Sequence, residues 1–180
     1  GKSTLCNLIS RFWDVDGGKI TIGGVDVRDY TLDSLLTNIS EVFQKVYLFA
    51  DTIENNIKFG NPAASHEEVV KAAQKACCHE FIMSLPDGYG TVIGEGGATL
   101  SGGEKQRVAI ASAIASGKEF LIFDEPTSGL DLKNMMKVSE NLVYLQKLGV
   151  TSFIITHDFE LIMEVCSHIL HMEDGKIIDI

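Results

Sequence analysis

The pattern of hydrophobic and polar residues predicts buried strands that alternate with amphipathic helices. Residues 120–123 are all apolar, and two acids and Pro126 follow them at once. A short apolar run of this kind is typical of a strand buried in a parallel sheet. Pro126 should end the strand, because proline has no N–H to continue the ladder. Similar patterns predict strands over 40–44 and 151–156.

Most other hydrophobic residues recur with helical spacing. Ser65 and Glu68 form a capping-box pattern, which predicts the start of a long helix that ends near Leu85. No strand separates this helix from one over 52–59, so we expect an inserted helical subdomain over about residues 50–115. Further helices are predicted over 5–12, 31–39, 104–116, 132–148 and 159–166, and short strands over 19–22, 169–172 and 176–180. The whole pattern predicts an α/β fold with a mostly parallel sheet.

Composition and charge narrow the class of protein. A chain of 180 residues favours a single domain over 1–180, and 45% hydrophobic with 22% charged residues is ordinary for a soluble globular protein. The net charge of −10 argues against nucleic acid or an anionic membrane surface, since both attract basic patches. The four cysteines have no metal-binding spacing, and we interpret them as packed thiols in a reducing, cytosolic setting.

Asp124 and Glu125 are the strongest candidates for chemistry. They should lie at the carboxyl end of a buried strand, which is the edge of an open α/β sheet where ligands bind. Two carboxylates there can hold a metal ion and orient or deprotonate a nucleophile. The alternative is an aspartate that caps the next helix beside a solvated glutamate. Gln44 and His157 follow the other two predicted strands and should reach the same crevice, although Gln44 by itself also fits a simple strand-end polar group.

Two predicted helices begin with residues suited to anion binding. The first four residues, GKST, match the end of the pattern GxxxxGK[ST], in which backbone N–H groups and Lys2 bind phosphates and the Ser3 hydroxyl binds Mg²⁺. The segment 100–107, LSGGEKQR, places Ser101 and two glycines before a second helix. The alternative for that segment is an ordinary helix start capped by Ser101.

The order of these motifs closely resembles the nucleotide-binding domain of ABC transporters. GKST, Gln44, LSGGEKQR, FLIFDEPTSGLD and His157 follow one another in the family order, and the third and fourth motifs together are highly specific. The resemblance covers essentially the whole chain. It implies a P-loop NTPase (RecA-like) fold with ATP and Mg²⁺ as cofactors. In this family two domains meet head to tail, with ATP between Walker A of one and the signature of the other, which accounts for two anion sites on one domain.

The resemblance implies a role for each matched residue. Asp124 matches the Walker B aspartate that holds Mg²⁺ through water, Glu125 the general base that polarises the attacking water, and His157 the switch histidine at the γ-phosphate. Ser3, Gln44 and Asp124 are expected around the metal, with Gln44 also near the transmembrane partner. The nucleotide-binding positions are Gly1, Lys2, Ser3 and Thr4 of Walker A, Gln44, the signature residues Ser101, Gly102, Gly103 and Glu104, and Asp131 of the D-loop.

The resemblance also implies partners and a place in the cell. The chain would be an ATP-hydrolysing motor domain that pairs with a second nucleotide-binding domain, identical or different, and drives transport across a membrane. It would lie on the cytoplasmic face, joined to transmembrane domains that are either fused or separate, and no nucleic acid is expected. The alternatives are a soluble ABC ATPase not linked to transport and a catalytically inert fragment.

The chain departs from the family pattern in two ways. The Walker A glycines and the strands before them are missing, so we expect a domain incomplete at its N-terminus that binds ATP poorly and hydrolyses it weakly or not at all. The first half resembles exporters, whereas from about Val108 the chain resembles importer or energy-coupling cassettes, with Pro126 and Asp158 among the differing positions. This change indicates a natural hybrid or a join made at LSGGEKQR when the sequence was assembled.

Overall fold

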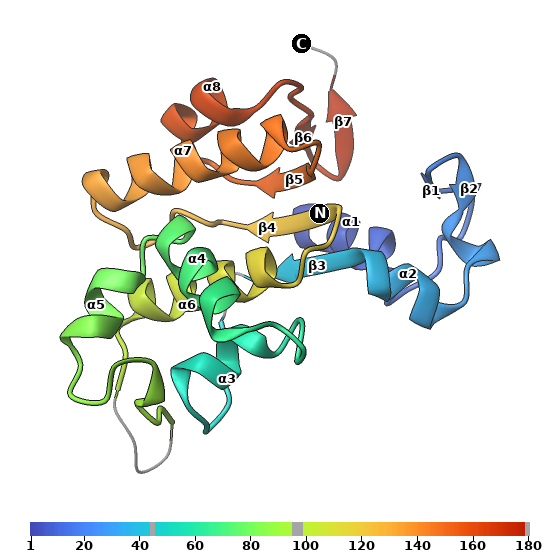
Figure 1. Cartoon of the computed structure of the whole chain (residues 1–180). Coiled ribbons are helices and arrows are strands. Elements are labelled where there is room, and N and C mark those ends of the chain that lie inside the picture. The colour runs from blue at the N-terminus through green and yellow to red at the C-terminus, as the bar shows by residue number, and fades with distance from the viewer. Residues whose placement is uncertain (44–45, 95–98, 179–180) are drawn as a thin grey trace.

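A parallel sheet lies at the centre of the part of the chain that the structure describes. The computed structural model describes residues 1–43, 46–94 and 99–178. Its central strands are β3 (Ile39–Val42), β4 (Phe120–Asp124) and β5 (Thr151–Ile155), which pair in the order β3-β4-β5 (Figure 1). All pairings in this sheet are parallel. The predicted α/β fold with a mostly parallel core is therefore confirmed.

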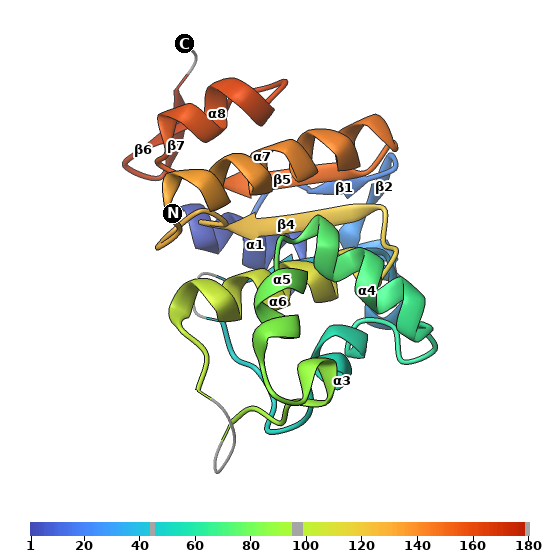
Figure 2. The same cartoon turned by 60° about the vertical axis from the view of Figure 1, so that its left-hand side comes forward.

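Helices cover both faces of this sheet. They are α1 (Lys2–Ile9), α2 (Leu32–Asn38), α3 (Ile53–Lys58), α4 (His66–Lys75), α5 (His79–Ser84), α6 (Gly102–Ala115), α7 (Leu132–Lys147) and α8 (Phe159–Val165). On the face that carries Leu121 and Phe123 lie α3 to α8, with α7 and α8 toward β5 and α4 to α6 toward the other edge of the sheet (Figure 2). On the face that carries Ile122 lie α1 and α2. Short elements complete the described chain: β1 (Thr21–Ile22), β2 (Val25–Asp26), β6 (His171–Glu173), β7 (Lys176–Ile178) and the 3₁₀ turns Val27–Asp29 and Gly88–Gly90.

The apolar run of β4 supplies two cores, one on each face of the sheet. Leu121 and Phe123 are buried in the larger core, which also contains residues of α3 to α8. Ile122 points the other way and is buried with Cys6 and Ile9 of α1. Successive side chains of a strand alternate between faces, so consecutive apolar residues are needed where both faces are covered. The strand at the centre of the sheet thus holds the helix of the GKST motif in place.

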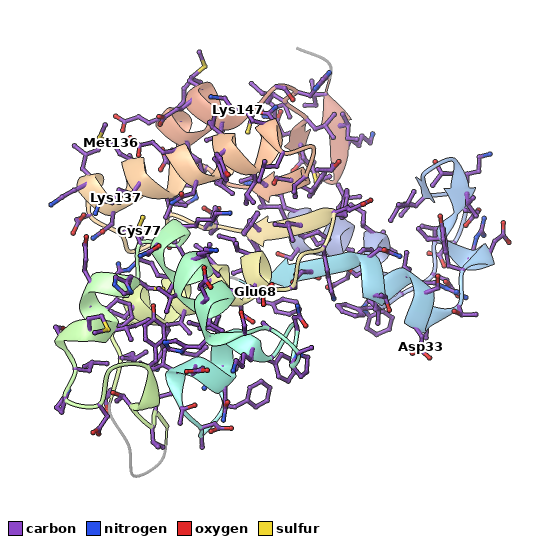
Figure 3. The ribbon with its side chains drawn as sticks, in the orientation of Figure 1. Asp33, Glu68, Cys77, Met136, Lys137 and Lys147 are labelled. Carbon is purple, nitrogen blue, oxygen red and sulfur yellow. The ribbon has the colours of Figure 1, made fainter. Side chains whose placement is uncertain are left out.

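The long helix predicted from Ser65 to Leu85 is two helices, and that prediction was wrong in its middle. α4 begins with the predicted capping box, and Figure 3 labels Glu68 in its first turn. The chain leaves the helix at Cys77, whose φ of 56° is left-handed, and resumes as α5. The break places the Cys78 side chain in the core and lets Asn141 of α7 donate to Cys77 Sγ at 3.4 Å. Helical periodicity continues across a single left-handed residue, so the sequence pattern gave no sign of it.

Two antiparallel hairpins lie at the periphery of the described chain. β1 pairs with β2, and β6 pairs with β7, in the region where the sequence predicted strands over 169–172 and 176–180. In Figure 1, β1, β2 and α2 lie beyond the start of β3, away from α3 to α8. Among the helices of the described residues, none combines the length and the apolar content that crossing a bilayer requires.

Candidate functional site

The carboxyl end of β4 meets the start of α1 through one side-chain hydrogen bond. The Ser3 hydroxyl donates to Asp124 Oδ2 at 3.2 Å, although the two residues are 121 positions apart in the sequence. Asp124 is the last residue of β4, and Ser3 lies in the first turn of α1. A hydroxyl and a carboxylate oxygen side by side at a helix N-terminus form the kind of hard-oxygen donor set that binds Mg²⁺ with several waters. Both residues fit the metal-binding role expected of them.

Glu125 is held by contacts from the end of the neighbouring strand. Its N–H donates to Ile155 O at 2.8 Å, which extends the β4–β5 ladder by one residue. One carboxylate oxygen accepts from the Thr156 hydroxyl at 3.3 Å, and the other lies 2.8 Å from His157 Nδ1. The Glu125 side chain is 10% exposed and that of His157 is 79% exposed. The acid is therefore shielded, while the imidazole reaches from it into solvent.

The backbone of Glu125 adopts an unusual conformation that other residues stabilise. Its φ is 54°, in the left-handed region that non-glycine residues seldom adopt. Gln106 of α6, itself buried, donates from Nε2 to Glu125 O at 3.0 Å. Ser128 N donates to the same carbonyl at 3.1 Å. These bonds hold the peptide that follows the acid pair, and Pro126 lies fully buried behind it.

A second carboxylate and a thiol lie beneath the Ser3–Asp124 contact. Glu41 of β3 is half-buried and accepts from the Ser10 hydroxyl at 3.1 Å. Burial, and then the negative charge of Asp124, raise the pKa of Glu41. Burial raises the pKa of the Cys6 thiol to about 12, with smaller contributions from Glu41 and Asp124. Cys6 is therefore a buried, weakly acidic thiol, and Glu41 is a second carboxylate close to Asp124.

The signature segment is closed by hydrogen bonds within itself. Ser101 caps α6: its hydroxyl accepts from Glu104 N at 3.3 Å, and Glu104 Oε2 accepts from Ser101 N at 2.7 Å. The first N–H groups of a helix have no intrahelical acceptor, so this box satisfies Glu104 N but leaves those of Gly102 and Gly103 to other partners. Ser101 is a helix cap, as the alternative interpretation held. Capping uses only a lone pair of its hydroxyl, so the proton can still be donated to an anion.

The residues around Asp131 line the same cleft as the signature. The cleft is lined by residues 101–107 together with 128–131 and Asn134. Asp131 caps α7, since its carboxylate accepts from Asn134 N at 2.8 Å and from Asn134 Nδ2 at 3.0 Å. A Cβ added to Gly103 would lie 3.1 Å from Leu130 Cδ2, so the two segments touch closely. The signature and the D-loop segment therefore form one surface.

The structure brings most of the predicted site residues into two groups. Ser3, Asp124, Glu125 and His157 form the first group, and Lys2 at the start of α1 lines a groove with Thr156 at the end of β5. The second group is Ser101 to Glu104 with Asp131. Gly1 precedes α1 as its N-cap and Thr4 lies exposed in the first turn. The prediction for Gln44 lies outside the described residues.

Sequence reasoning missed Gln106 and Thr156 as members of the site. Gln106 lies inside the quoted motif LSGGEKQR, and Thr156 directly precedes His157. A buried glutamine on an otherwise apolar helix face was the available signal for the first. No local pattern distinguishes Thr156 from any threonine that ends a strand.

Comparisons with known proteins agree with this geometry. A family model described as "ABC transporter" matches residues 1–128. An ATP-dependent lipid A-core flippase of Syntrophus aciditrophicus is 46% identical over 99% of this chain and 30% of its own length. ABC transporter B family member 24, mitochondrial, of Arabidopsis thaliana is 44% identical over 99% of this chain and 26% of its own length.

A solved structure provides the corresponding comparison in three dimensions. A bacterial Atm1-family ABC exporter with ATP bound matches 99% of this chain with a TM-score of 0.94 and 38% sequence identity. The match covers 31% of that protein's chain. The chain therefore spans less than a third of these relatives, and the matches cover both sides of LSGGEKQR.

Proposed function

This chain belongs to the ABC transporter family, and on that premise we propose that it is the ATP-binding and ATP-hydrolysing motor domain of an exporter. The observation that carries the proposal is the constellation at the strand ends, where Ser3 meets Asp124 and Glu125 meets His157. The structural relative has ATP bound, and nearly all of this chain superposes on it. One relative is named as a flippase and the structural relative as an exporter, and both names favour export over import.

We assign the phosphate and metal contacts to the edge where α1 begins. Lys2 and the N–H groups of the first turn of α1 provide positive potential for the β- and γ-phosphates. Ser3 and Asp124 would hold Mg²⁺, which neutralises phosphate charge when bound. Gly1 and Thr4 flank these groups on the same turn, and Gln44 is proposed as a further ligand. Phosphoryl transfer needs little covalent chemistry from the protein, so positioning of these groups accounts for most of the expected catalysis.

Glu125 and His157 are proposed as the catalytic pair. The carboxylate of Glu125 is shielded and held at both oxygens, as a general base that orients a water molecule requires. For the short contact with an ionised Glu125, His157 Nδ1 must carry a proton. Nε2 of the exposed ring then faces outward, where it can contact a phosphate. Through its two ring nitrogens, His157 would therefore link Glu125, the proposed base, to the γ-phosphate.

The second group supports a head-to-tail dimer. Ser101, Gly102 and Gly103 offer a hydroxyl and two N–H groups at the start of α6, and Glu104 and Asp131 frame the same cleft. We propose that this surface binds the nucleotide held by a second nucleotide-binding domain. The packing of α3 and α4 on α6 supports the proposed helical subdomain over about residues 50–115.

We propose the groove beside β3 as the contact with a transmembrane domain. The groove is lined along Ile39 to Phe43 and by aromatic rings, of which Phe59 is 65% exposed and lies 4.5 Å from the ring of Phe49. Exposed rings around a hollow are typical of a protein–protein contact. A partner there would hold the domain at the cytoplasmic face of a membrane.

The test uses the full-length protein that contains this chain, purified in detergent and returned to vesicles. We expect Mg²⁺-dependent ATP hydrolysis, and the variant Glu125→Gln should lower kcat by roughly a thousandfold while it still binds ATP. The variant Glu80→Gln serves as a control, because Glu80 is an exposed acid on α5.

Three outcomes would overturn parts of the proposal. A Glu125→Gln variant as active as the parent would remove Glu125 as the base. A parent that hydrolyses ATP but moves no lipid or amphipathic drug between leaflets would favour an ABC ATPase not linked to export. A full-length parent that binds no ATP would favour a catalytically inert domain.

A further inference from the structure

We propose that Thr127, Thr156 and Asp158 form a clasp that positions the carboxylate of Glu125 for hydrolysis. The inference rests on the proposed function and adds three positioning residues to it. None of the three is expected to touch nucleotide or metal; each acts through Glu125.

The clasp is a reciprocal exchange between the segments that follow β4 and β5. Thr156, after β5, donates its hydroxyl to Glu125 Oε2 at 3.3 Å. Thr127, after β4, donates its hydroxyl to Asp158 Oδ2 at 3.1 Å. Each segment thus gives one hydroxyl to an acid of the other, and the 31-residue separation is the same in both bonds. Two parallel bonds of this kind resist both sliding and twisting of one segment against the other.

A backbone bond sets the direction of the Thr156 proton. Asp158 N donates to Thr156 Oγ1 at 3.0 Å, so the hydroxyl oxygen already accepts a hydrogen bond. Its single proton is then directed to Glu125, which ionised can only accept. The bond to a charged carboxylate is stronger than one between neutral groups. Asp158 therefore fixes Thr156, and Thr156 fixes Glu125.

Asp158 is itself anchored at its other oxygen. Oδ1 accepts from Glu160 N at 3.0 Å and from Leu161 N at 3.2 Å, which caps α8, and Oδ2 remains for Thr127. Leu161 is fully buried in the larger core. The chain of contacts thus runs from the packed start of α8 through Asp158 to the catalytic edge.

Glu125 needs such support because its backbone adopts an unfavourable left-handed conformation. Its left-handed φ of 54° is a conformation that persists only where surrounding bonds hold it. Thr127 is 7% exposed and lies two residues beyond Glu125. Its bond to Asp158 therefore holds the chain two residues after Glu125. Gln106 and Ile155 hold the backbone of Glu125 itself, at its carbonyl oxygen and at its N–H.

Steady-state ATP hydrolysis by the full-length protein tests the clasp. Thr156→Val should lower kcat about tenfold, and Thr127→Val about fivefold, with the KM for ATP within about twofold of the parent, because a misplaced base slows chemistry without weakening nucleotide binding. Thr156→Ser and Thr127→Ser keep the hydroxyl and should restore kcat to within about twofold. Because both threonines act through the one Glu125 carboxylate, the double valine variant should be no slower than about the Thr156→Val variant.

Ser139→Ala is the matched control for loss of a buried hydroxyl. Among the described residues, the one partner of Ser139 Oγ is Met135 O of its own helix, and this variant should keep the parent's kcat. Valine variants with the parent's kcat, serine variants as slow as the valine ones, or multiplied losses in the double variant would each overturn the clasp. If Glu125→Gln abolishes hydrolysis in the same series, such a result leaves the proposed function standing; a parent without ATPase activity overturns both.

Discussion

The two proposed nucleotide contacts of this chain are built in opposite ways. At the strand ends, every key hydrogen bond joins distant parts of the sequence: Ser3 to Asp124, and Glu125 to Thr156 and His157. At the signature, Ser101 bonds to Glu104, and the neighbouring Asp131 bonds to Asn134, each three positions away. The first region exists only in the folded domain, whereas the second consists of helix starts that their own side chains complete.

This difference indicates a division of work. The strand-end region has its acids and hydroxyls arranged toward one another, so a single domain holds the groups proposed for hydrolysis in place. The signature region has its polar side chains satisfied locally and leaves the N–H groups of Gly102 and Gly103 without an acceptor inside the helix. A surface of that kind suits recognition of a nucleotide that another domain presents. Four changes test the contrast, in order of decreasing effect.

Removal of the long-range metal contact should have the largest effect. Asp124→Asn, and to a smaller extent Ser3→Ala, should lower kcat by about a hundred- to a thousandfold and raise the Mg²⁺ concentration at half-maximal activity, because a hard anionic ligand is lost. ATPase rates across a Mg²⁺ titration measure this. Asp33→Asn, at an exposed acid of α2, is the control. An Asp124→Asn variant with the parent's Mg²⁺ dependence would remove Asp124 from the metal site.

Removal of the signature cap has a matched counterpart in the same molecule. Ser65 and Glu68 at the start of α4 form a capping box with the same distances, 2.7 and 3.3 Å, as Ser101 and Glu104. Ser65→Ala and Ser101→Ala should each cost about 1 kcal/mol of stability in urea unfolding. Only Ser101→Ala should also lower ATP hydrolysis, by about tenfold, since only that hydroxyl is proposed to contact nucleotide. Equal activities of the two variants would make Ser101 a cap and nothing more.

The two signature glycines should differ in their tolerance of a methyl group. A Cβ on Gly102 meets nothing within 4 Å, whereas one on Gly103 lies 3.1 Å from Leu130 Cδ2 and 3.4 Å from Gly129 O. Alanine favours a helix over glycine, so Gly102→Ala should stabilise the fold. Crowding should cancel that gain at Gly103 and leave this variant less stable than Gly102→Ala by about 1 kcal/mol. Thermal unfolding compares the stabilities of the two alanine variants. Equal stabilities would show that Gly129 and Leu130 move aside at no cost.

The smallest effect is expected at Glu41, beneath the strand-end region. Burial and the charge of Asp124 raise its pKa above the ordinary 4.5, so the folded protein binds this proton more tightly than the unfolded chain. Stability is therefore lost as the pH rises from the unfolded pKa through the folded pKa. Glu41→Gln removes that loss and should raise the melting temperature by no more than about 3 °C near pH 8 and hardly at all near pH 4. A stabilisation that is equal at both pH values would assign the effect to packing.

Much of the fold was readable from the sequence because its signals are local. The run 120–123 gave β4, Thr31 and Thr52 lie as caps just before α2 and α3, and the glycine at 149 follows α7. Each of these signals lies within a few residues of the element it predicts. The break at Cys77 was missed because its cause lies in tertiary contacts. Cys78 is buried in the core, and Asn141 of α7 donates a hydrogen bond to Cys77.

The residues of the candidate site also divide into those with a local sequence signal and those without one. Asp124, Glu125 and His157 were predicted to converge because parallel strands end at one edge, and the contact of Glu125 with His157 confirms that geometry. The catalytic roles themselves stay predictions. Thr127 and Thr156 could not be predicted, since their partners are 31 positions away and nothing in the local pattern points to them. Gln106 had a signal in its apolar helix face, but its partner, 19 positions away, had none.

The hydrogen bond from Gln106 to the carbonyl of Glu125 has a mechanical consequence. α6 has 14 residues and is therefore about 21 Å long, and Gln106 lies one turn from its start. If α6 tilts against the sheet, either the Glu125 peptide must move with it or the buried Gln106–Glu125 hydrogen bond must break. A partner docked on the far end of α6 would therefore have mechanical leverage on Glu125, the proposed base, through this single hydrogen bond.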